Sequence, residues 1–505
     1  MTRRAYSRTI PVGLLMAGLL VTPAMAECVR VIGTEGGGSA LTMDPAFALL
    51  NDDAYQHNLV YNRLVNLDSN FQPVPELARS WSVSDDGLTW TFNLEEGVTF
   101  HDGKPFTADD VVFTFRRLID PDLGSPAAGL LTFLDADGIV AVDAHTVTMT
   151  TPDIVAELPI LIANKSYIVE DGSTTDFLHD HGVGTGPFVQ DVYDIAQSIR
   201  IFQRNPDYWR EGLPLADCID LKVINEEVSR IAAIQAGSVD LILSAGPATL
   251  TTLAGDPRVT LVASEGAGMY NNLSMEVDEA PFDDARVRLA MKLVVDRQMV
   301  VDTMLLGNGI VGNDNPVAPN NPLAYRDDAI PRDVDRAREL LAEAGYPDGI
   351  DIDLNTSDAG PGYVMLAQLY QQMAADAGIR VNIVMSPVDS YWDNVWMQVP
   401  FFSSSWNGRA AMESLAYNYT SGATYNEAHW KNAEFDALLD RARADTDADE
   451  RTALMRQAQE ILADDGGVII PAFFLESSAL RAGCTGYVPH PSASIYNYET
   501  LTCAD

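Results

Sequence analysis

The chain has 505 residues, 47% of them hydrophobic, and a formal net charge of −40 at pH 7. This length allows two or three domains, and the hydrophobic content excludes an intrinsically disordered chain despite the charge. A surface this acidic repels phosphate backbones, so we expect no nucleic-acid partner.

The N-terminus has the pattern of an export signal. Three arginines within the first eight residues precede an apolar run at 10–21, and the stretch 23–26 ends in Ala-Met-Ala. This pattern predicts a signal peptide over 1–26, cleaved after Ala26 and exported by the Sec or the twin-arginine route. The apolar run is too short for a membrane anchor, and no later segment is long enough to span a bilayer.

Cys28 lies just past the predicted cleavage site, which raises the question of a lipid anchor. Lipid attachment needs a small residue directly before the cysteine, and Glu27 occupies that position. We therefore expect a free protein in the periplasm, an oxidising compartment in which disulfides form and persist.

Four widely spaced cysteines predict two disulfides in such a compartment. Cys28–Cys218 would tie the mature N-terminus to the middle of the chain, and Cys484–Cys503 would staple the C-terminal segment. Four cysteines allow three pairings, and the sequence does not choose among them. Because no C-x-x-C motif occurs, we expect no metal site, and we expect no cofactor.

The first long stretch of the mature chain is rich in predicted strands. Apolar and polar residues alternate over 88–94, after the turn signal Asp-Asp-Gly at 85–87, which predicts a hairpin. Thr107 can cap the helix that follows it. A second hairpin is predicted over 139–149.

Farther along, helices alternate with short strands. A helix over 227–236 ends at Gly237, and four more are predicted from Asp333 to Gly345 and over 363–377, 435–442 and 450–462. Strands are predicted at 239–243, 381–385 and 468–474. Such an alternation indicates an α/β fold. No floppy linker is present, so we expect the chain to cross between two lobes along 270–277 and 467–474, forming a hinge.

Several short runs in a fixed order resemble the family 5 extracellular solute-binding proteins, which include periplasmic dipeptide- and oligopeptide-binding proteins. Each run is weak alone, but together they cover nearly the whole mature chain. They are Pro75–Trp81, Asp85–Phe92, Phe100–Val111, Gly184–Phe188, Asn205–Trp209, Ala236–Asp240 and Ala337–Pro347. His101 and the two glycines at 184 and 186 fall within these runs, and we interpret them as loop-building residues rather than catalytic or nucleotide-binding ones.

The resemblance implies an α/β fold of the periplasmic binding protein type II-like class, with two lobes joined by a two-strand hinge. Lobe I would combine 27–57, 186–276 and 469–505 with an extra β-rich subdomain over 58–185. Lobe II would be an inserted α/β lobe over 277–468. The resemblance also implies an ABC importer with permease subunits in the inner membrane, and we expect the binding protein to be a monomer.

The segment 405–409 reads Ser-Trp-Asn-Gly-Arg. In dipeptide- and oligopeptide-binding members of the family, an aspartate in this segment pairs with the α-ammonium group of the peptide. Here Trp406 matches, but Arg409 stands in the place of that aspartate. A guanidinium repels an ammonium and suits a carboxylate, a phosphate or sugar hydroxyls. Alternatively, Arg409 forms an ion pair with Glu413, four residues on.

Further ligand contacts are expected from aromatic and amide side chains near this segment, from the proposed hinge strand, and from a lobe I loop whose backbone often lines the cleft in the family. These candidates are Asn407, Tyr270, Asn271, Asn272, Tyr391, Trp392, Leu41 and Met43.

The sequence thus predicts a binding protein that closes on a solute and delivers it to a permease. Peptides and peptide-like solutes are the leading ligand class, and opines, oligosaccharides and other anionic or polyhydroxylated solutes are the alternative. A chemosensory or chaperone-like periplasmic binding protein is a second alternative. A hydrolase would need a catalytic set, and neither G-x-S-x-G nor H-E-x-x-H occurs, so we expect no enzyme.

Overall fold

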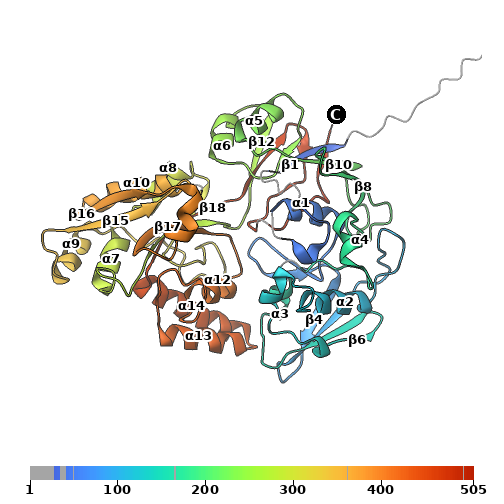
Figure 1. Ribbon diagram of the computed structural model, residues 1–505, viewed down its shortest axis with the longest axis horizontal. Coiled ribbons are helices and arrows are strands. Elements are labelled where there is room, and N and C mark those ends of the chain that lie inside the picture. Colours follow the sequence, from blue (N-terminus) through green and yellow to red (C-terminus); the bar gives the residue numbers. More distant parts are fainter. Residues whose placement is uncertain are drawn as a thin grey trace, which may run out of the picture.

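The computed structural model describes residues 28–33, 41–48, 51–163, 166–360, 362–492 and 494–504, without the side chains of residues 51 and 389. The predicted signal peptide lies outside the described residues. The chain forms two bodies that lie side by side in Figure 1. We call the body on the right lobe I and the body on the left lobe II. None of the described helices is both long and apolar enough to cross a membrane.

Lobe I is built on a 7-stranded sheet that collects strands from the start, the middle and the end of the chain. The N-terminal strand β1 lies near its centre and runs parallel to both of its neighbours, β10 and β11. In sheet order the strands are β12 (Val259–Ala263), β19 (Ser477–Arg481), β11 (Leu241–Ile242), β1 (Val29–Gly33), β10 (Cys218–Val223), β9 (Ile199–Arg204) and β8 (Phe188–Asp194).

Four helices accompany this sheet, α1 (Asn51–Val60), α4 (Thr175–Asp180), α5 (Glu227–Gln235) and α6 (Pro247–Leu253). The predicted helix over 227–236 is confirmed as α5, and Gly237 follows it with a φ of 71°. Two short strands, β20 (Cys484–Thr485) and β21 (Thr502–Cys503), pair near the C-terminus.

The β-rich part of lobe I is a 4-stranded sheet at the lower right of Figure 1. Both predicted hairpins are confirmed in it. In β5, every second residue is buried, and Gly87 supplies a positive φ of 73° at the preceding turn. The sheet order is β4 (Ala78–Val83), β5 (Thr89–Leu94), β7 (Thr146–Thr150) and β6 (Ile139–Asp143).

Helix α2 (Ala108–Leu118) packs over this sheet and begins where the sequence predicted. The Asp110 carboxylate accepts a hydrogen bond of 2.7 Å from the backbone N–H of Thr107, so a capping box closes the N-terminus. The remaining short elements of this region are the 3₁₀ turns Pro45–Phe47, Pro126–Leu130 and Ala136–Gly138, the strands β2 (Val65–Leu67) and β3 (Pro73–Pro75), and the helix α3 (Leu158–Ala163).

The glycine motif at 184–186 allows two segments of backbone to pack closely against each other. A Cβ added to Gly184 would lie 2.2 Å from the carbonyl oxygen of Val60, at the end of α1. His101 Nε2 donates a 3.0 Å hydrogen bond to the carbonyl oxygen of Gly186. Both observations fit the interpretation of these residues as loop-building rather than catalytic.

Lobe II is built on a 6-stranded mixed sheet. Its order is β14 (Gly309–Val311), β18 (Val468–Phe474), β13 (Tyr270–Met275), β17 (Phe401–Trp406), β15 (Ile350–Thr356) and β16 (Ile379–Met385). One buried core lies between the sheet and α7 (Ala285–Leu293), α8 (Arg297–Met304), α9 (Val334–Glu343) and α10 (Tyr363–Ala375).

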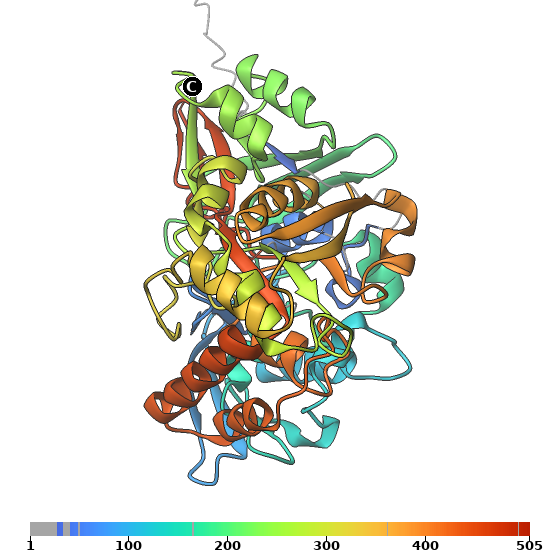
Figure 2. The same cartoon turned by 90° about the vertical axis from the view of Figure 1, so that its left-hand side faces the viewer.

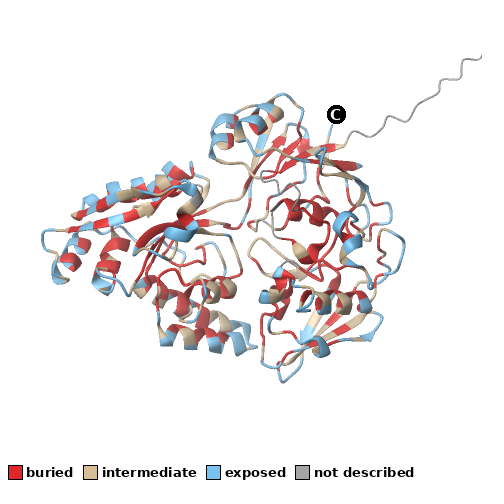
Figure 3. Cartoon of the chain, viewed as in Figure 1, coloured by how far each residue is buried: buried red, intermediate tan, exposed pale blue. Residues whose placement is uncertain are grey.

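A second buried core covers the other side of this sheet, under α12 (Ala411–Tyr419), α13 (Ala433–Ala444) and α14 (Ala448–Asp465). The 3₁₀ turn Val388–Ser390 and α11 (Tyr391–Asn394) precede β17. Figure 3 shows buried strands between helices with exposed outer sides. In the turned view of Figure 2, α14 is the long dark-orange helix that runs obliquely at the lower left. The helices predicted over 333–345, 363–377, 435–442 and 450–462 are all confirmed.

The path between the lobes differs from the expectation. Strands β13 and β18 pair with each other inside the sheet of lobe II, and both are almost fully buried. They are therefore central strands, and the predicted limits of lobe II at 277 and 468 cut through its sheet. The chain leaves lobe I after Ala263 and returns at Ser477. We call 264–269 and 475–476 the two connectors.

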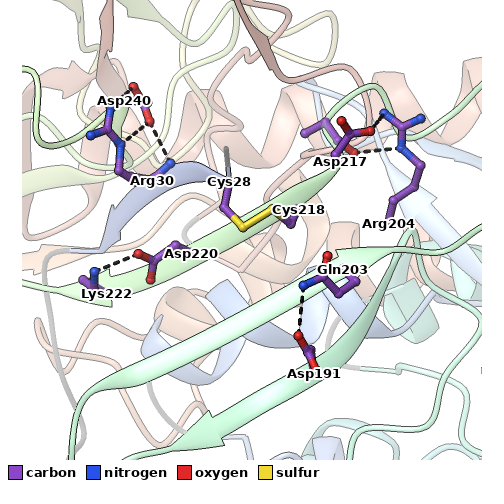
Figure 4. Close-up of a disulfide and its surroundings, with 11 residues drawn as sticks. Cys28, Arg30, Asp191, Gln203, Arg204, Asp217, Cys218, Asp220, Lys222 and Asp240 are labelled. Atoms are coloured by element: carbon purple, nitrogen blue, oxygen red, sulfur yellow. Dashed lines mark hydrogen bonds and ion pairs between the residues drawn. A yellow bond between two sulfur atoms is a disulfide. The ribbon is translucent and has the colours of Figure 1, made fainter. Parts of the chain in front are cut away.

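Both predicted disulfides are present, Cys28–Cys218 and Cys484–Cys503. Figure 4 shows the first disulfide bridging the start of β1 to the start of β10. Beside it, the buried carboxylate of Asp240 accepts a 2.8 Å hydrogen bond from Arg30 Nε. Asp240 also lies close to Cys484 and Cys503. Among the described residues, these three form the one group of possible metal ligands close enough together to share an ion, but the two sulfurs are bonded to each other.

Removal of the Cys28–Cys218 disulfide by a double serine substitution is expected to lower the free energy of unfolding by about 2–4 kcal/mol. The bond joins residues 190 apart, so its loss frees more of the unfolded chain than loss of Cys484–Cys503, which spans 19. Urea unfolding followed by tryptophan fluorescence measures both variants. A greater loss for the Cys484–Cys503 variant would contradict this ranking.

Candidate functional site

Lobe II meets lobe I at the loop that joins β17 to α12. A Cβ added to Gly408 in this loop would lie 3.0 Å from Cζ of Phe71, a residue of lobe I. Ala410 packs with Phe71 and Ile160 in a small buried apolar cluster that spans the two lobes. The loop 407–410 therefore faces lobe I, and side chains around it border the space between the lobes.

Arg409 lies in this loop with three neighbours from lobe II. Its Nε is 3.4 Å from Oε1 of Glu413, and its guanidinium carbon lies 5.5 Å from the ring centre of Trp406 and 4.9 Å from that of Tyr417. The structure thus contains the Arg409–Glu413 ion pair that the sequence offered as an alternative to ligand contact. Burial raises the pKa of Glu413, and the nearby charge of Arg409 opposes that rise.

Helix α12 has one stripe that is only partly buried. Glu413, Ala416 and Tyr417 on this stripe are only partly buried. The spacing of Glu413 and Tyr417 places them on the same side of the helix, next to Arg409. The residues that α12 buries are Ala411, Met412, Ser414, Leu415, Asn418 and Tyr419.

Five aromatic rings form a continuous, partly exposed surface next to Arg409. We call Trp392, Trp396, Trp406, Tyr417 and Tyr425 the aromatic wall. Ring centres are 5.8 Å apart for Trp392–Trp396, 6.0 Å for Trp396–Tyr425, 5.9 Å for Trp406–Tyr425 and 4.8 Å for Tyr417–Tyr425. Trp392 is 48% exposed. The wall extends from α11 to the loop after α12, and only Trp392 and Trp406 were predicted as site residues.

The other predicted aromatic residues lie deeper. Tyr270 is 1% exposed, and its hydroxyl lies 3.4 Å from that of Tyr419. Tyr391 is fully buried and donates a 2.6 Å hydrogen bond to the carbonyl oxygen of Ser403. Both side chains pack inside lobe II in this conformation, so exposure gives no support to a ligand role, which stays a prediction for them.

The predicted polar contacts divide into exposed and buried groups. Asn407 is exposed in the loop between β17 and α12, whereas Asn271 and Asn272 on β13 are buried. In lobe I, Leu41 and Met43 are buried, and both backbone polar groups of Met43 are used within the lobe. The Met43 N–H donates to a lobe I carbonyl, and its oxygen accepts from the Tyr61 hydroxyl. Met43 therefore has little backbone left to offer a ligand.

Glu427 is a site residue that sequence reasoning missed. Its buried carboxylate accepts hydrogen bonds from Asn272 Nδ2 and Ser274 Oγ, both at 2.8 Å, from Trp396 Nε1 at 2.6 Å and from the Ser404 hydroxyl. It thus joins β13 and β17 to the back of the aromatic wall. The available signal was the density of aromatic residues over 391–425, but nothing local marks Glu427 as the partner of Trp396 and of polar residues on β13 and β17.

Two further features lie where the lobes meet. At the rim, the Ala156 N–H of lobe I donates a 3.1 Å hydrogen bond to the Arg443 oxygen at the end of α13, and Glu157 lies 3.6 Å from Arg451 Nε on α14. Nearer the connectors, a small hollow of about 20 Å³, with room for about one water molecule, is bordered by Arg409, by 69–71 of lobe I and by 316–318, 320 and 321 of lobe II, among others. The rim contacts have to separate if the lobes move apart.

Glu427→Ala is expected to lower the free energy of unfolding by about 3 kcal/mol, because buried donors lose their shared acceptor. Since Trp396 loses its hydrogen bond, the tryptophan emission of the folded protein should shift as well. Urea unfolding and emission spectra measure the two effects. Glu434→Ala removes an exposed carboxylate from α13 of the same lobe and serves as the control. Equal stability of both variants would contradict this role of Glu427.

Arg451→Glu is expected to open the molecule, because it places a second carboxylate beside Glu157 at the rim. Small-angle X-ray scattering should show a larger radius of gyration than for the wild type. Adding Glu157→Arg restores opposite charges and should reverse the change. Arg441→Glu, an equal charge change at an exposed position of α13, is the control. An unchanged radius for Arg451→Glu would show that the rim contact does not hold the lobes together.

Comparisons with known proteins place this architecture in a family. The chain matches the model of the bacterial extracellular solute-binding proteins, family 5 middle region, over residues 72–428. Heme-binding protein A of Haemophilus influenzae is 30% identical over 472 residues, covering 86% of this chain and 85% of that protein. Di/tripeptide-binding protein 1 of Pseudomonas aeruginosa is 30% identical over 510 residues, covering 92% and 93%.

A solved structure agrees with the fold. HbpA2 from Haemophilus parasuis superposes with a TM-score of 0.82 at 22% identity, covering 95% of this chain and all of that one. The match to the family model and the two relatives of similar length support the same assignment. The chain belongs to family 5 of the bacterial extracellular solute-binding proteins.

Proposed function

We propose that this protein is the periplasmic solute-binding component of an ABC importer. It captures a peptide or peptide-like solute between its two lobes and delivers it to permease subunits in the inner membrane. Family membership supports the binding role, and the named relatives bind heme and di- or tripeptides. The protein works as a monomer, and its role requires binding without covalent chemistry.

The observation that carries this proposal is the position of Arg409. The loop 407–410 of lobe II touches Phe71 and Ile160 of lobe I, so a solute held at Arg409 lies where both lobes can reach it. A ligand that contacts both lobes only when they are together favours the closed form by its difference in affinity for the two forms. The connectors 264–269 and 475–476 are the segments about which the lobes turn.

The positive charge of Arg409 indicates which chemical group of the solute binds next to it. A guanidinium repels an α-ammonium group and binds a carboxylate through its Nη edge. Peptides are therefore held through a carboxylate at this point, rather than through their N-terminus. Opines and other anionic solutes offer an acidic group in the same way, and oligosaccharides and other polyhydroxylated solutes offer hydroxyl oxygens that accept from the guanidinium, so these remain the alternative ligand class.

A thermal-shift screen of the purified mature protein tests the proposal. Di- and tripeptides, glutathione, opines and oligosaccharides are added one by one, and at least one should raise Tm by several degrees, because a bound solute stabilises the folded state by mass action. Arg409→Gln should weaken binding of an anionic solute roughly 10- to 100-fold. Arg441→Gln is the control. Absence of a shift with every solute class would contradict the proposal.

A further inference from the structure

We infer that the aromatic wall and Arg409 together select solutes that combine a planar ring system with a carboxylate. The inference rests on the proposed function, because it names the ligand class of the same cleft. The inference is based on how the five rings and the guanidinium are arranged. Neither membership of the family nor the ligands of the named relatives require this arrangement.

The wall lies at the surface of lobe II, with Trp396 and Trp406 packed against buried apolar clusters beneath it. All five rings are partly exposed, although contiguous aromatic surface is costly to leave in contact with water. Trp430, in the same lobe, shows the contrast, since it is 2% exposed and its Nε1 donates to Asp465. The planes of Trp396 and Tyr425 are inclined by 30°, and these two rings stack on each other. Trp392 meets Trp396 at 75° and Trp406 meets Tyr425 at 66°, so the wall offers a planar solute single ring faces and ring edges.

The wall is also held rigidly from behind. Trp396 Nε1 donates to the buried carboxylate of Glu427, which is fixed in turn by β13 and β17. Trp406 ends β17, and Tyr417 belongs to α12. Rings that are fixed in place lose little conformational freedom when a ligand stacks on them, so the wall is prepared for stacking.

Arg409 supplies the second half of the selection. Its Nε pairs with Glu413, and its two Nη groups have no hydrogen-bond partner in the part of the chain that the structure describes. The guanidinium carbon lies 4.9 Å from the centre of the Tyr417 ring, so a carboxylate bound by the Nη groups stands directly beside the wall. A solute that carries both groups can therefore satisfy the cation and cover the rings at once.

A matched pair of probes tests the ring requirement. Binding of N-acetyl-Phe-Phe and N-acetyl-Ala-Ala, which have the same charge and backbone, is measured by isothermal titration calorimetry on the mature protein. Protoporphyrin IX serves as a larger planar dicarboxylate. At least one ring-bearing probe should bind roughly tenfold tighter than N-acetyl-Ala-Ala, the gain expected from aromatic contacts with the wall. Equal or weaker binding of both ring-bearing probes would overturn the inference.

Variants of the wall residues test whether these rings cause the tighter binding of ring-bearing probes. Trp392→Ala and Tyr417→Leu should weaken the ring-bearing probes several-fold and leave N-acetyl-Ala-Ala unchanged. Trp81→Leu removes a half-buried ring from β4 of lobe I and should change neither. Arg409→Gln should weaken the acid of the better ring-bearing probe and spare its amide. Ring preference that survives both wall variants would overturn the inference.

The same measurements separate this inference from the proposed function. If other solutes raise Tm while ring-bearing carboxylates have no advantage, the inference fails and the binding role stands. If no solute of any class is bound, the proposed function itself fails, and the inference fails with it.

Discussion

The whole arrangement depends on the chain crossing between its two sheets at two segments that are hydrogen-bonded to each other. The Ser264 N–H donates to the oxygen of Glu476, and the Glu476 N–H donates to the Ser264 hydroxyl. Because both connectors lie together, the lobes are joined along one narrow line. If the proposed movement occurs about that line, it changes the distance between Phe71 and the loop 407–410 while each sheet stays intact.

The charge at the lobe junction is the feature in which this chain is predicted to differ from the dipeptide-binding pattern. Arg409 lies in the loop before α12, and Glu413 in the first turn of α12 partly compensates its charge. An ion pair in a partly buried place contributes little net stability, since desolvation offsets most of the attraction. The pair is therefore better understood as a way to hold Arg409 beside the rings than as a stabilising contact.

Much of the fold could be predicted because the signals are local. The hairpin around Gly87 follows from alternating residues and a glycine turn, and α2 follows from the capping residue Thr107. Two disulfides were expected from the four cysteines, but the sequence left three pairings open, and the structure contains Cys28–Cys218 and Cys484–Cys503. The predicted limits of lobe II were misplaced because apolar runs such as β13 and β18 are expected both in strands that cross between lobes and in the central strands of a sheet. Only their hydrogen-bonded neighbours separate the two cases.

By itself, the sequence determined most of the secondary structure and the family, since both depend on neighbours along the chain. It also predicted a ligand-binding role for the segment around Trp406 and Arg409. Tertiary structure alone decided that Tyr270, Asn272 and Tyr391 face the interior, and that Glu427 supports the aromatic wall. The physical reason is that burial and hydrogen bonding at these positions depend on contacts between segments far apart in the chain. The spacing of residues does not specify such contacts.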